Sequence, residues 1–144
     1  MILADSSVWI DYLRGRDTPQ VERLIAGVEA SEVAIGDLML GEVLHGLPTE
    51  RAFDEARRFF AALDHIRISD PQVALQAARN YRTLRAKGVT VRKTIDTLIA
   101  TRCILAGLPL LFSDRDFQPF VEHLALVDAM AATRTPLPYP SPRT

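Results

Sequence analysis

The sequence predicts an α/β fold with a mainly parallel central sheet of four to five strands. Short apolar runs alternate along the chain with longer amphipathic ones, and this alternation is typical of strands joined by crossover helices. The length of 144 residues, with 48% hydrophobic and 24% charged residues, fits a single globular domain. We therefore expect one folded unit over residues 1–134.

The strands are predicted from the short apolar runs. They are expected at residues 1–4, 32–35, 65–68, 109–112 and 124–127. A helical pattern separates each of the first three from the next, and such crossovers join parallel strands.

The helices are predicted from apolar residues at helical spacing and from residues that begin or end helices. They are expected at residues 8–15, from Pro19 onward, at 37–46, from Thr49 onward, from Pro71 to about Lys87, and at 93–107. Asp70 is a good N-cap, and Gly15, Gly88 and Gly107 suit helix ends. Residues 135–144 contain four prolines, and we expect an extended tail there.

The composition predicts a cytoplasmic protein. The opening MILADSS reaches a carboxylate at Asp5, which leaves no apolar region long enough for a signal peptide. The longest uncharged stretch, residues 103–113, is shorter than the roughly 20 residues that cross a bilayer. The single cysteine, Cys103, lies in an apolar run and is expected in the core.

The net charge of −1 gives no direct sign of a nucleic-acid partner, because such proteins usually have a basic surface. The balance changes if some acids are metal ligands. Without Asp5, Glu42, Asp96, Asp114 and Asp116, the rest of the chain carries +4. The total charge therefore does not exclude an RNA substrate.

Three acids from distant segments are predicted to meet at one edge of the sheet. Asp5 directly follows the first predicted strand, and Asp114 follows the fourth after Ser113. Asp96 lies in the first turn of the helix that leads into the fourth strand, and a right-handed crossover begins at that same edge. Carboxylates placed together repel one another unless a cation or a proton neutralises them.

Oxygen ligands without attendant Cys or His favour a hard cation, Mg²⁺ or Mn²⁺. Carboxylate clusters that hold one or two such ions activate water and stabilise the charge that develops on a phosphate during hydrolysis. In this interpretation Asp5 is the central ligand, Asp96 and Asp114 flank it, and Glu42 binds metal or orients the attacking water.

Each acid taken alone also has a purely structural explanation. Asp5 and Asp114 are suitable helix caps, and Asp96 in a first turn is stabilised by the helix dipole. Spacing alone favours Asp37 over Glu42 as the fourth acid, because Asp37 is nearer the strand end, although Asp37 is also a natural N-cap. None of these structural explanations predicts that the acids lie close together.

Four segments of the chain resemble, in order, the motifs of VapC-type PIN domains. They are ILADSSVWIDYLRG, GEVLHG around Glu42, IDTLIA around Asp96, and FSDRDF around Asp114 and Asp116. The opening motif is specific for this class, and the matching positions extend to about Val127. The resemblance implies a three-layer α/β/α PIN fold and an Mg²⁺- or Mn²⁺-dependent endoribonuclease that acts as the toxin of a toxin–antitoxin pair.

The resemblance also assigns roles to residues and implies partners. It favours Glu42 over Asp37 and implies an acidic quartet of Asp5, Glu42, Asp96 and Asp114, with Asp116 as a fifth candidate. It gives Ser6 or Ser7 the role of supporting the metal site. It further implies a homodimer and a VapB-like antitoxin, bound in a higher-order complex through an apolar groove that Trp9 or Tyr12 reaches.

Basic residues near the acids are candidate contacts for RNA phosphates. Arg92 and Lys93 lie just before Asp96, and Arg115 lies between two of the acids. For Arg85 and Lys87 a solvated helix end is an equally good explanation.

Other functions fit the sequence less well. A haloacid dehalogenase-type phosphatase needs a second Asp where this chain has Ser7, and a response-regulator receiver needs a lysine at a strand end that we do not find. A flap-type DNA nuclease would usually need additional helices. The remaining alternative is a nucleic-acid-binding or regulatory component of an antitoxin complex with little nuclease activity.

Overall fold

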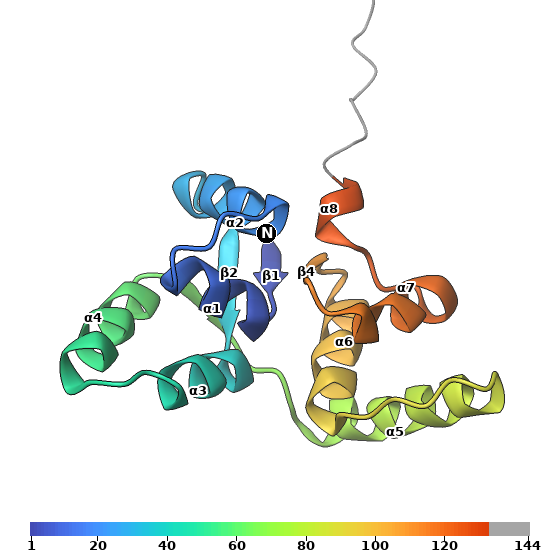
Figure 1. The fold of residues 1–144 in the computed structure, drawn as a ribbon. Coiled ribbons are helices and arrows are strands. Elements are labelled where there is room, and N and C mark those ends of the chain that lie inside the picture. Colours follow the sequence, from blue (N-terminus) through green and yellow to red (C-terminus); the bar gives the residue numbers. More distant parts are fainter. Residues whose placement is uncertain (133–144) are drawn as a thin grey trace, which may run out of the picture.

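A parallel sheet of four strands forms the centre of the molecule in the computed structural model, which describes residues 1–132 (Figure 1). The strand order is β3-β2-β1-β4. The strands are β1 (Ile2–Ala4), β2 (Val33–Gly36), β3 (Asp64–Ile66) and β4 (Leu110–Leu111). The register pairs Leu3 with both Ala34 and Leu110, so β1 lies in the interior of the sheet.

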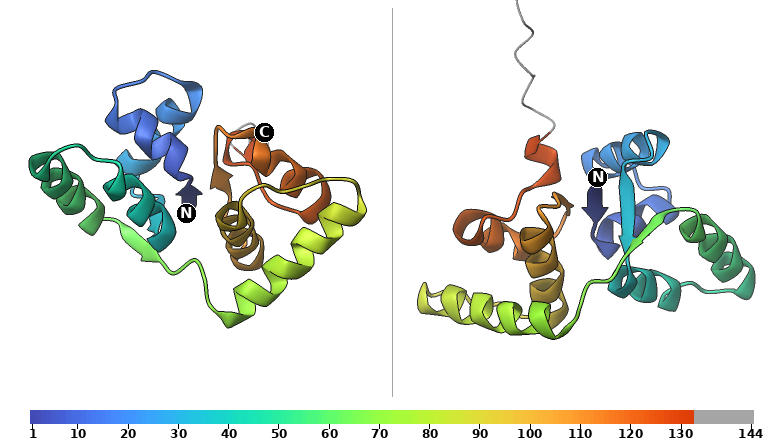
Figure 2. Two further views of the ribbon diagram at one scale, coloured as in Figure 1. Left: turned by 60° about the horizontal axis from the view of Figure 1, so that its bottom comes forward. Right: turned by 180° about the vertical axis from the view of Figure 1, so that it is seen from behind.

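The helices form two groups. They are α1 (Ser6–Leu13), α2 (Pro19–Glu29), α3 (Asp37–His45), α4 (Glu50–Ala61), α5 (Pro71–Ala86), α6 (Thr94–Ala106), α7 (Gln118–Leu124) and α8 (Ala129–Ala132), with a short 3₁₀ helix, η1, at Arg115–Phe117. In Figures 1 and 2, α1 to α4 lie together on one side of the molecule and α5 to α8 on the other. The first group packs as α2 and α3 on α1, the second as α5 on α6. This arrangement confirms the predicted α/β class.

The core lies between the strands and these helices. Leu3, Ala34 and Leu110 on adjacent strands are fully buried, and the aromatic side chains of Phe60 and Phe117 pack from opposite groups of helices. Burying a side chain of this size contributes roughly 1.5–3 kcal/mol. Cys103 is also buried, as predicted, and burial raises the pKa of its thiol to about 12, so it is no nucleophile.

Helix boundaries follow the predicted caps. The Asp70 carboxylate accepts a hydrogen bond from the Val73 N–H at 2.9 Å, directly before Pro71 in the first turn of α5. Gly107 ends α6 in the left-handed conformation, at φ 65°, which favours glycine.

The end of the chain differs from the prediction. Residues 124–127 do not form the expected fifth strand, because α7 ends there with Ala125 in the left-handed conformation. Within the described residues, only an isolated bridge between Leu110 and Asp128 extends the sheet on this side. The elements η1, α7 and α8 were not predicted. The predicted proline-rich tail at 135–144 lies outside the described residues.

The topology determines where functional side chains gather. All four strands are parallel, so their carboxyl ends meet at one edge of the sheet. Asp5 follows β1 at that edge, and the chain reaches Asp114 shortly after β4. Among residues 1–132, no helix is long and apolar enough to span a membrane.

Candidate metal centre

Asp5 is fixed at the end of the central strand by its own helix. It is the N-cap of α1, and its Oδ2 accepts hydrogen bonds from the Ser7 backbone N–H at 3.4 Å and from the Ser7 hydroxyl at 2.9 Å. The residue is only 6% exposed. Asp5 therefore caps a helix and also occupies the strand end, so the structural and functional interpretations do not exclude each other.

Asp96 joins Asp114 and Asp116 in a tight acidic cluster. One carboxylate oxygen from each of the three lies within 4.8 Å of the others. Asp114 caps η1 by accepting a hydrogen bond from the Asp116 N–H at 2.9 Å, which brings these two acids together. Asp96 is 8% exposed, and its Oδ2 is buried without a hydrogen-bond partner in the described part of the chain.

Glu42 lies outside this group of three but close enough to Asp5 for the two charges to interact. The charge of Asp5 raises the pKa of Glu42, after the larger effect of burial, while a hydrogen bond with the Ser6 side chain lowers it. Asp37 is engaged elsewhere: its Oδ1 accepts hydrogen bonds from the N–H groups of Leu38 and Ile68, both at 2.9 Å. Gly36, and not Asp37 as predicted, is the N-cap of α3.

The inner carboxylates are held in an environment that disfavours their charge. Burial is the main reason that the pKa of Asp5 is raised, opposed by its hydrogen bonds to Ser7 and reinforced by the charge of Asp114. Burial, together with the charge of Asp5, raises the pKa of Asp96 to about 6. Mutual repulsion thus links acids from three distant segments.

Lys93 forms an ion pair with one of the acids. Its ammonium forms an ion pair with the Asp114 carboxylate at 3.8 Å, and its charge lowers the pKa of both Glu42 and Asp96. The position of Lys93 follows from its place as the N-cap of α6, two residues after Val91. Arg92 and Arg115 are both exposed, and neither forms an ion pair within residues 1–132.

This arrangement fits a divalent metal ion. All candidate ligands are carboxylate oxygens, which suit hard cations, and their negative charges require neutralisation. The unpaired Oδ2 of Asp96 is the most direct sign, because a buried carboxylate oxygen without a partner costs free energy that a cation would offset.

The expected contribution of Trp9 to a surface groove is corrected by the structure. Trp9 is 0% exposed and packs edge-on against Tyr12, Phe59 and Phe60. Helical spacing places it on the inner face of α1, where a large aromatic ring fills the core. Tyr12 is partly buried and stacks on Phe59.

Two contacts that hold α6 against the start of α5 were not predicted. The Arg102 guanidinium donates to the Ile68 carbonyl at 3.1 Å and to the Asp70 carboxylate at 2.9 Å, which ties α6 to the start of α5. The signal available in the sequence was an arginine inside the apolar run IATRCILAG. Its partners, more than 30 positions away, have no local signature.

A family model described as the PIN domain matches residues 2–121, which include all five acids. Two curated relatives are 32% identical over 120 residues, covering 81% of this chain and 89% of each relative: "VapC ribonuclease Mb1587" of Mycobacterium bovis and "Ribonuclease VapC11" of Mycobacterium tuberculosis.

Two solved structures share the fold at low sequence identity. "VapBC2 from Rickettsia felis bound to a DNA fragment from their promoter" aligns with a TM-score of 0.66 and 19% identity, covering 88% of this chain and 96% of that one. A "toxin-antitoxin complex from Klebsiella pneumoniae" aligns with a TM-score of 0.64, 19% identity and the same coverage.

Proposed function

The chain belongs to the PIN-domain family, with VapC ribonucleases among its relatives, and from this premise we propose that it hydrolyses RNA phosphodiester bonds as the toxin of a toxin–antitoxin pair. The observation that carries the proposal is the acidic cluster at the carboxyl edge of the sheet, above all the buried, unpaired Oδ2 of Asp96. A carboxylate that only capped a helix or carried a surface charge would have its oxygens hydrogen-bonded or exposed to solvent.

The proposed ligands are Asp5, Asp96 and Asp114, with Asp116 as a further one. A bound Mg²⁺ or Mn²⁺ would supply an activated water and neutralise charge on the phosphate. The Ser7 hydroxyl holds Asp5 in position, and Asp114 holds the Asp116 backbone through the η1 cap. We prefer Mg²⁺ or Mn²⁺ over zinc because the donor set contains oxygen alone.

Glu42 is the proposed orienting group for the attacking water. It is the most exposed of the quartet and is held toward Asp5 by Ser6, so it borders both the cluster and solvent. The water oxygen forms a bond to phosphorus, one phosphorus–oxygen ester bond breaks, and the departing oxygen takes up a proton. Lys93, Arg92 and Arg115 are the proposed phosphate contacts beside this reaction.

The proposed partners are RNA and a VapB-like antitoxin. Support for the antitoxin comes from the relatives, since the two similar structures are toxin–antitoxin complexes. The proposed docking surface is an apolar groove of about 510 Å³ between α1, α3 and α4, lined by Ile10, Leu13, Val43 and Leu47. This groove suits the apolar face of an amphipathic helix. A homodimer, a higher-order complex with antitoxin and a cytoplasmic location complete the proposal.

Metal removal tests the proposed function. The purified chain should cleave single-stranded RNA in Mg²⁺ or Mn²⁺, lose the activity in excess EDTA and regain it when the metal is restored. Undiminished cleavage in chelator would contradict the mechanism. A folded protein that binds antitoxin but never cleaves RNA would instead support a regulatory component.

A further inference from the structure

The segment from α5 to the start of α6 has a charge unlike the rest of the chain. Residues 71–95 contain six lysines and arginines and no aspartate or glutamate. The cations are Arg79, Arg82, Arg85, Lys87, Arg92 and Lys93. Because the whole chain carries −1, the remainder carries −7, and the positive charge is concentrated in this segment.

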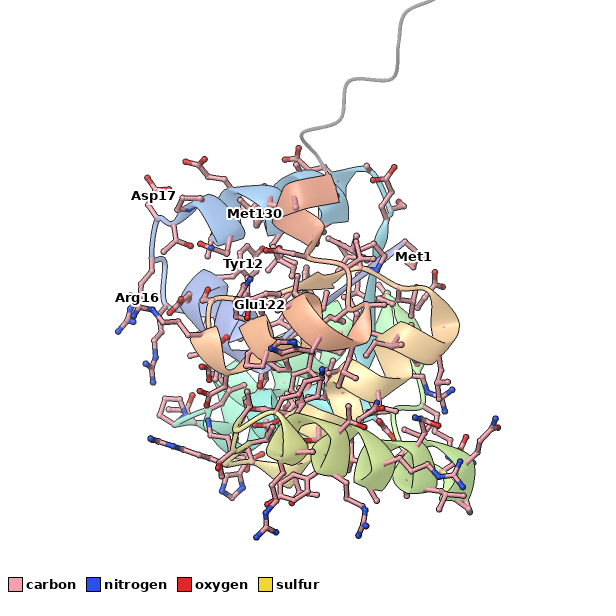
Figure 3. The ribbon with its side chains drawn as sticks, turned by 90° about the vertical axis from the view of Figure 1, so that its right-hand side faces the viewer. Met1, Tyr12, Arg16, Asp17, Glu122 and Met130 are labelled. Carbon is pink, nitrogen blue, oxygen red and sulfur yellow. The ribbon has the colours of Figure 1, made fainter. Side chains whose placement is uncertain are left out.

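These cations are exposed and mostly unpaired. All six are exposed, and within residues 1–132 only Lys93 forms an ion pair. Figure 3 shows nitrogen-tipped side chains that project from α5 away from the body of the molecule. On α4, by contrast, Arg51 pairs with Glu55 at 3.2 Å and Arg57 with Asp54 at 3.6 Å. A surface helix that only needed solubility would have such mixed charges.

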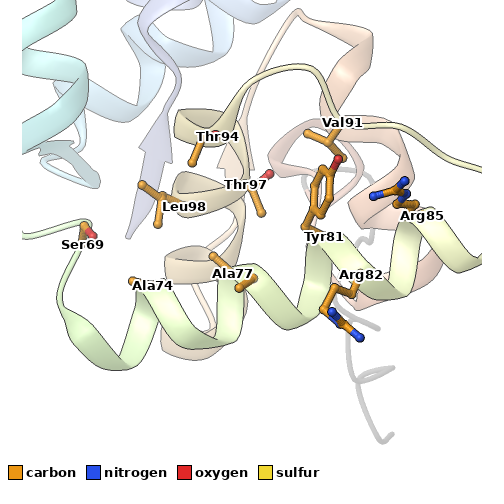
Figure 4. Close-up of a pocket in the computed structure, with 11 residues that line it drawn as sticks. Ser69, Ala74, Ala77, Tyr81, Arg82, Arg85, Val91, Thr94, Thr97 and Leu98 are labelled. Atoms are coloured by element: carbon orange, nitrogen blue, oxygen red, sulfur yellow. The ribbon is translucent and has the colours of Figure 1, made fainter.

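A groove of about 590 Å³ runs between α5 and the first turn of α6 (Figure 4). Ala74, Ala77 and Leu98 give it an apolar floor. Further along α5 it is lined by Tyr81, Arg82 and Arg85. A groove with an aromatic ring and a basic rim is the common arrangement for binding single-stranded nucleic acid.

The groove adjoins the metal centre through one helical turn. Thr94 and Thr97 line the groove, and Asp96 lies between them in sequence and faces the acidic cluster. The Lys93 carbonyl accepts hydrogen bonds from the Thr97 N–H at 3.4 Å and from its hydroxyl at 3.5 Å, which fixes this turn. The first turn of α6 therefore borders the acidic cluster on one side and the groove on another.

We propose that the α5–α6 groove binds single-stranded RNA beyond the scissile phosphate, with Tyr81 stacking on a base and Arg82 and Arg85 contacting phosphates. This inference rests on the proposed nuclease function. A second copy of the chain is a poorer occupant, because a two-fold contact through this face would oppose two segments that each carry six positive charges.

Binding measured without catalysis tests the proposal. The probe is a fluorescein-labelled 20-nucleotide oligouridine, and its anisotropy is followed in EDTA at several salt concentrations. The variant Arg82→Gln/Arg85→Gln should bind about tenfold more weakly, and its plot of log K against log salt should be shallower by about 1.4, the value for two lost contacts to a single strand. The matched control Arg51→Gln/Arg58→Gln removes the same charge from α4 and should bind like the wild type.

Stacking is tested separately at Tyr81. Tyr81→Leu should weaken binding about five- to hundredfold at an unchanged salt slope, while Tyr81→Phe should bind like the wild type, because the ring alone stacks. Thermal melts identify any variant that is unfolded. If Tyr81→Leu is unfolded, RNA binding by Tyr81→Phe is compared with that of the α4 control variant instead.

The outcomes separate this inference from the proposed function. The proposal that the groove binds RNA would be overturned if the α5 and α4 double variants lost oligouridine affinity equally, or if the wild type did not bind oligouridine. An unchanged salt slope accompanied by a changed oligomeric state in gel filtration would also overturn it, since the groove would then be a protein interface. Specific weakening of RNA binding in a chain that fails to cleave RNA in Mg²⁺ would support the groove and refute the nuclease.

Discussion

The acidic site has two parts that differ in burial. The inner pair, Asp5 and Asp96, is almost wholly buried, whereas the outer set, Glu42, Asp114 and Asp116, is half-buried or exposed. The inner pair is fixed by the backbone, at a strand end and in the first turn of a helix. The outer set borders solvent, which screens its charges.

The difference shows where the site conflicts with stability. Burial is the leading cause of the raised pKa at both inner carboxylates, and their charges repel each other. A protein selected for stability alone would remove such a pair, so its presence indicates a functional constraint. We therefore expect the inner pair to dominate both catalysis and the instability of the metal-free protein, and the outer set to have smaller effects.

Asp5→Asn should have the largest effect. Asparagine keeps the shape and the capping oxygen but removes the charge of a proposed metal ligand. Losing a group that only orients a metal ligand costs about 10- to 100-fold, so losing the ligand itself should lower RNA cleavage by at least about 100-fold. The metal-free variant should melt at an equal or higher temperature, because repulsion is relieved. Near-normal cleavage would show that Asp5 is only a helix cap.

The second prediction compares Glu42 with Asp37. Glu42→Gln should lower cleavage by about tenfold or more at a nearly unchanged melting temperature, because the side chain is exposed and acts on the water. Asp37→Ala should cost about 1 kcal/mol of stability through its lost hydrogen bond to the Ile68 N–H, with activity per folded molecule retained. Kinetics and melts on both variants decide this, and the reverse pattern would make Asp37 the fourth acid.

This pair also marks the limit of local sequence reasoning. Asp5 and Asp114 could be predicted because each follows a short apolar run that marks a strand. In a parallel sheet the ends of such strands lie at the same edge. Asp37 is nearer its strand than Glu42, but its partner, Ile68, is 31 residues away and has no local signature. Only the family motif favoured Glu42.

Other elements escaped prediction for related reasons. Residues 124–127 have the composition of a strand, but Ala125 adopts a left-handed conformation. This conformation is usually signalled by a glycine, and here the residue is alanine. The apolar spacing of α1 predicted that one face of the helix is buried. It did not distinguish which of the two aromatic rings, Trp9 or Tyr12, lies nearer the surface. The structure buries Trp9 and leaves Tyr12 only partly covered.

The third prediction concerns the pH dependence of the inner pair. The pKa of Asp96 is 3.8 in the unfolded chain and about 6 in the folded metal-free protein, so between these values the folded state holds a proton that the unfolded state lacks. Stability contributed by this proton is present at low pH and is lost as the pH rises through about 6. Melting temperatures in EDTA should therefore fall between about pH 4 and 6, and the fall should be smaller in Asp96→Asn. An identical pH profile in both proteins would contradict the burial of this charge.

The smallest effect is expected at Lys93, on the outer side of the site. Its ammonium lies 3.8 Å from Asp114 and occupies space near the acids that a metal ion would compete for. Removing it should tighten Mn²⁺ binding, measured by calorimetry without RNA. An exposed ion pair is worth about 0–1 kcal/mol, so the gain for Lys93→Gln should be at most about fivefold.

Arg92→Gln is the matched control for Lys93, because Arg92 is adjacent and exposed and forms no ion pair with the acids of the described chain. It removes the same charge and should change Mn²⁺ affinity by less than Lys93→Gln does. High salt should abolish the difference between the two variants, since it screens exposed charges and leaves buried ones largely unaffected. A gain in Mn²⁺ affinity that is equal in both variants would mean that the general positive potential, and not the contact with Asp114, opposes the metal. A gain that persists in high salt would place Lys93 with the inner pair.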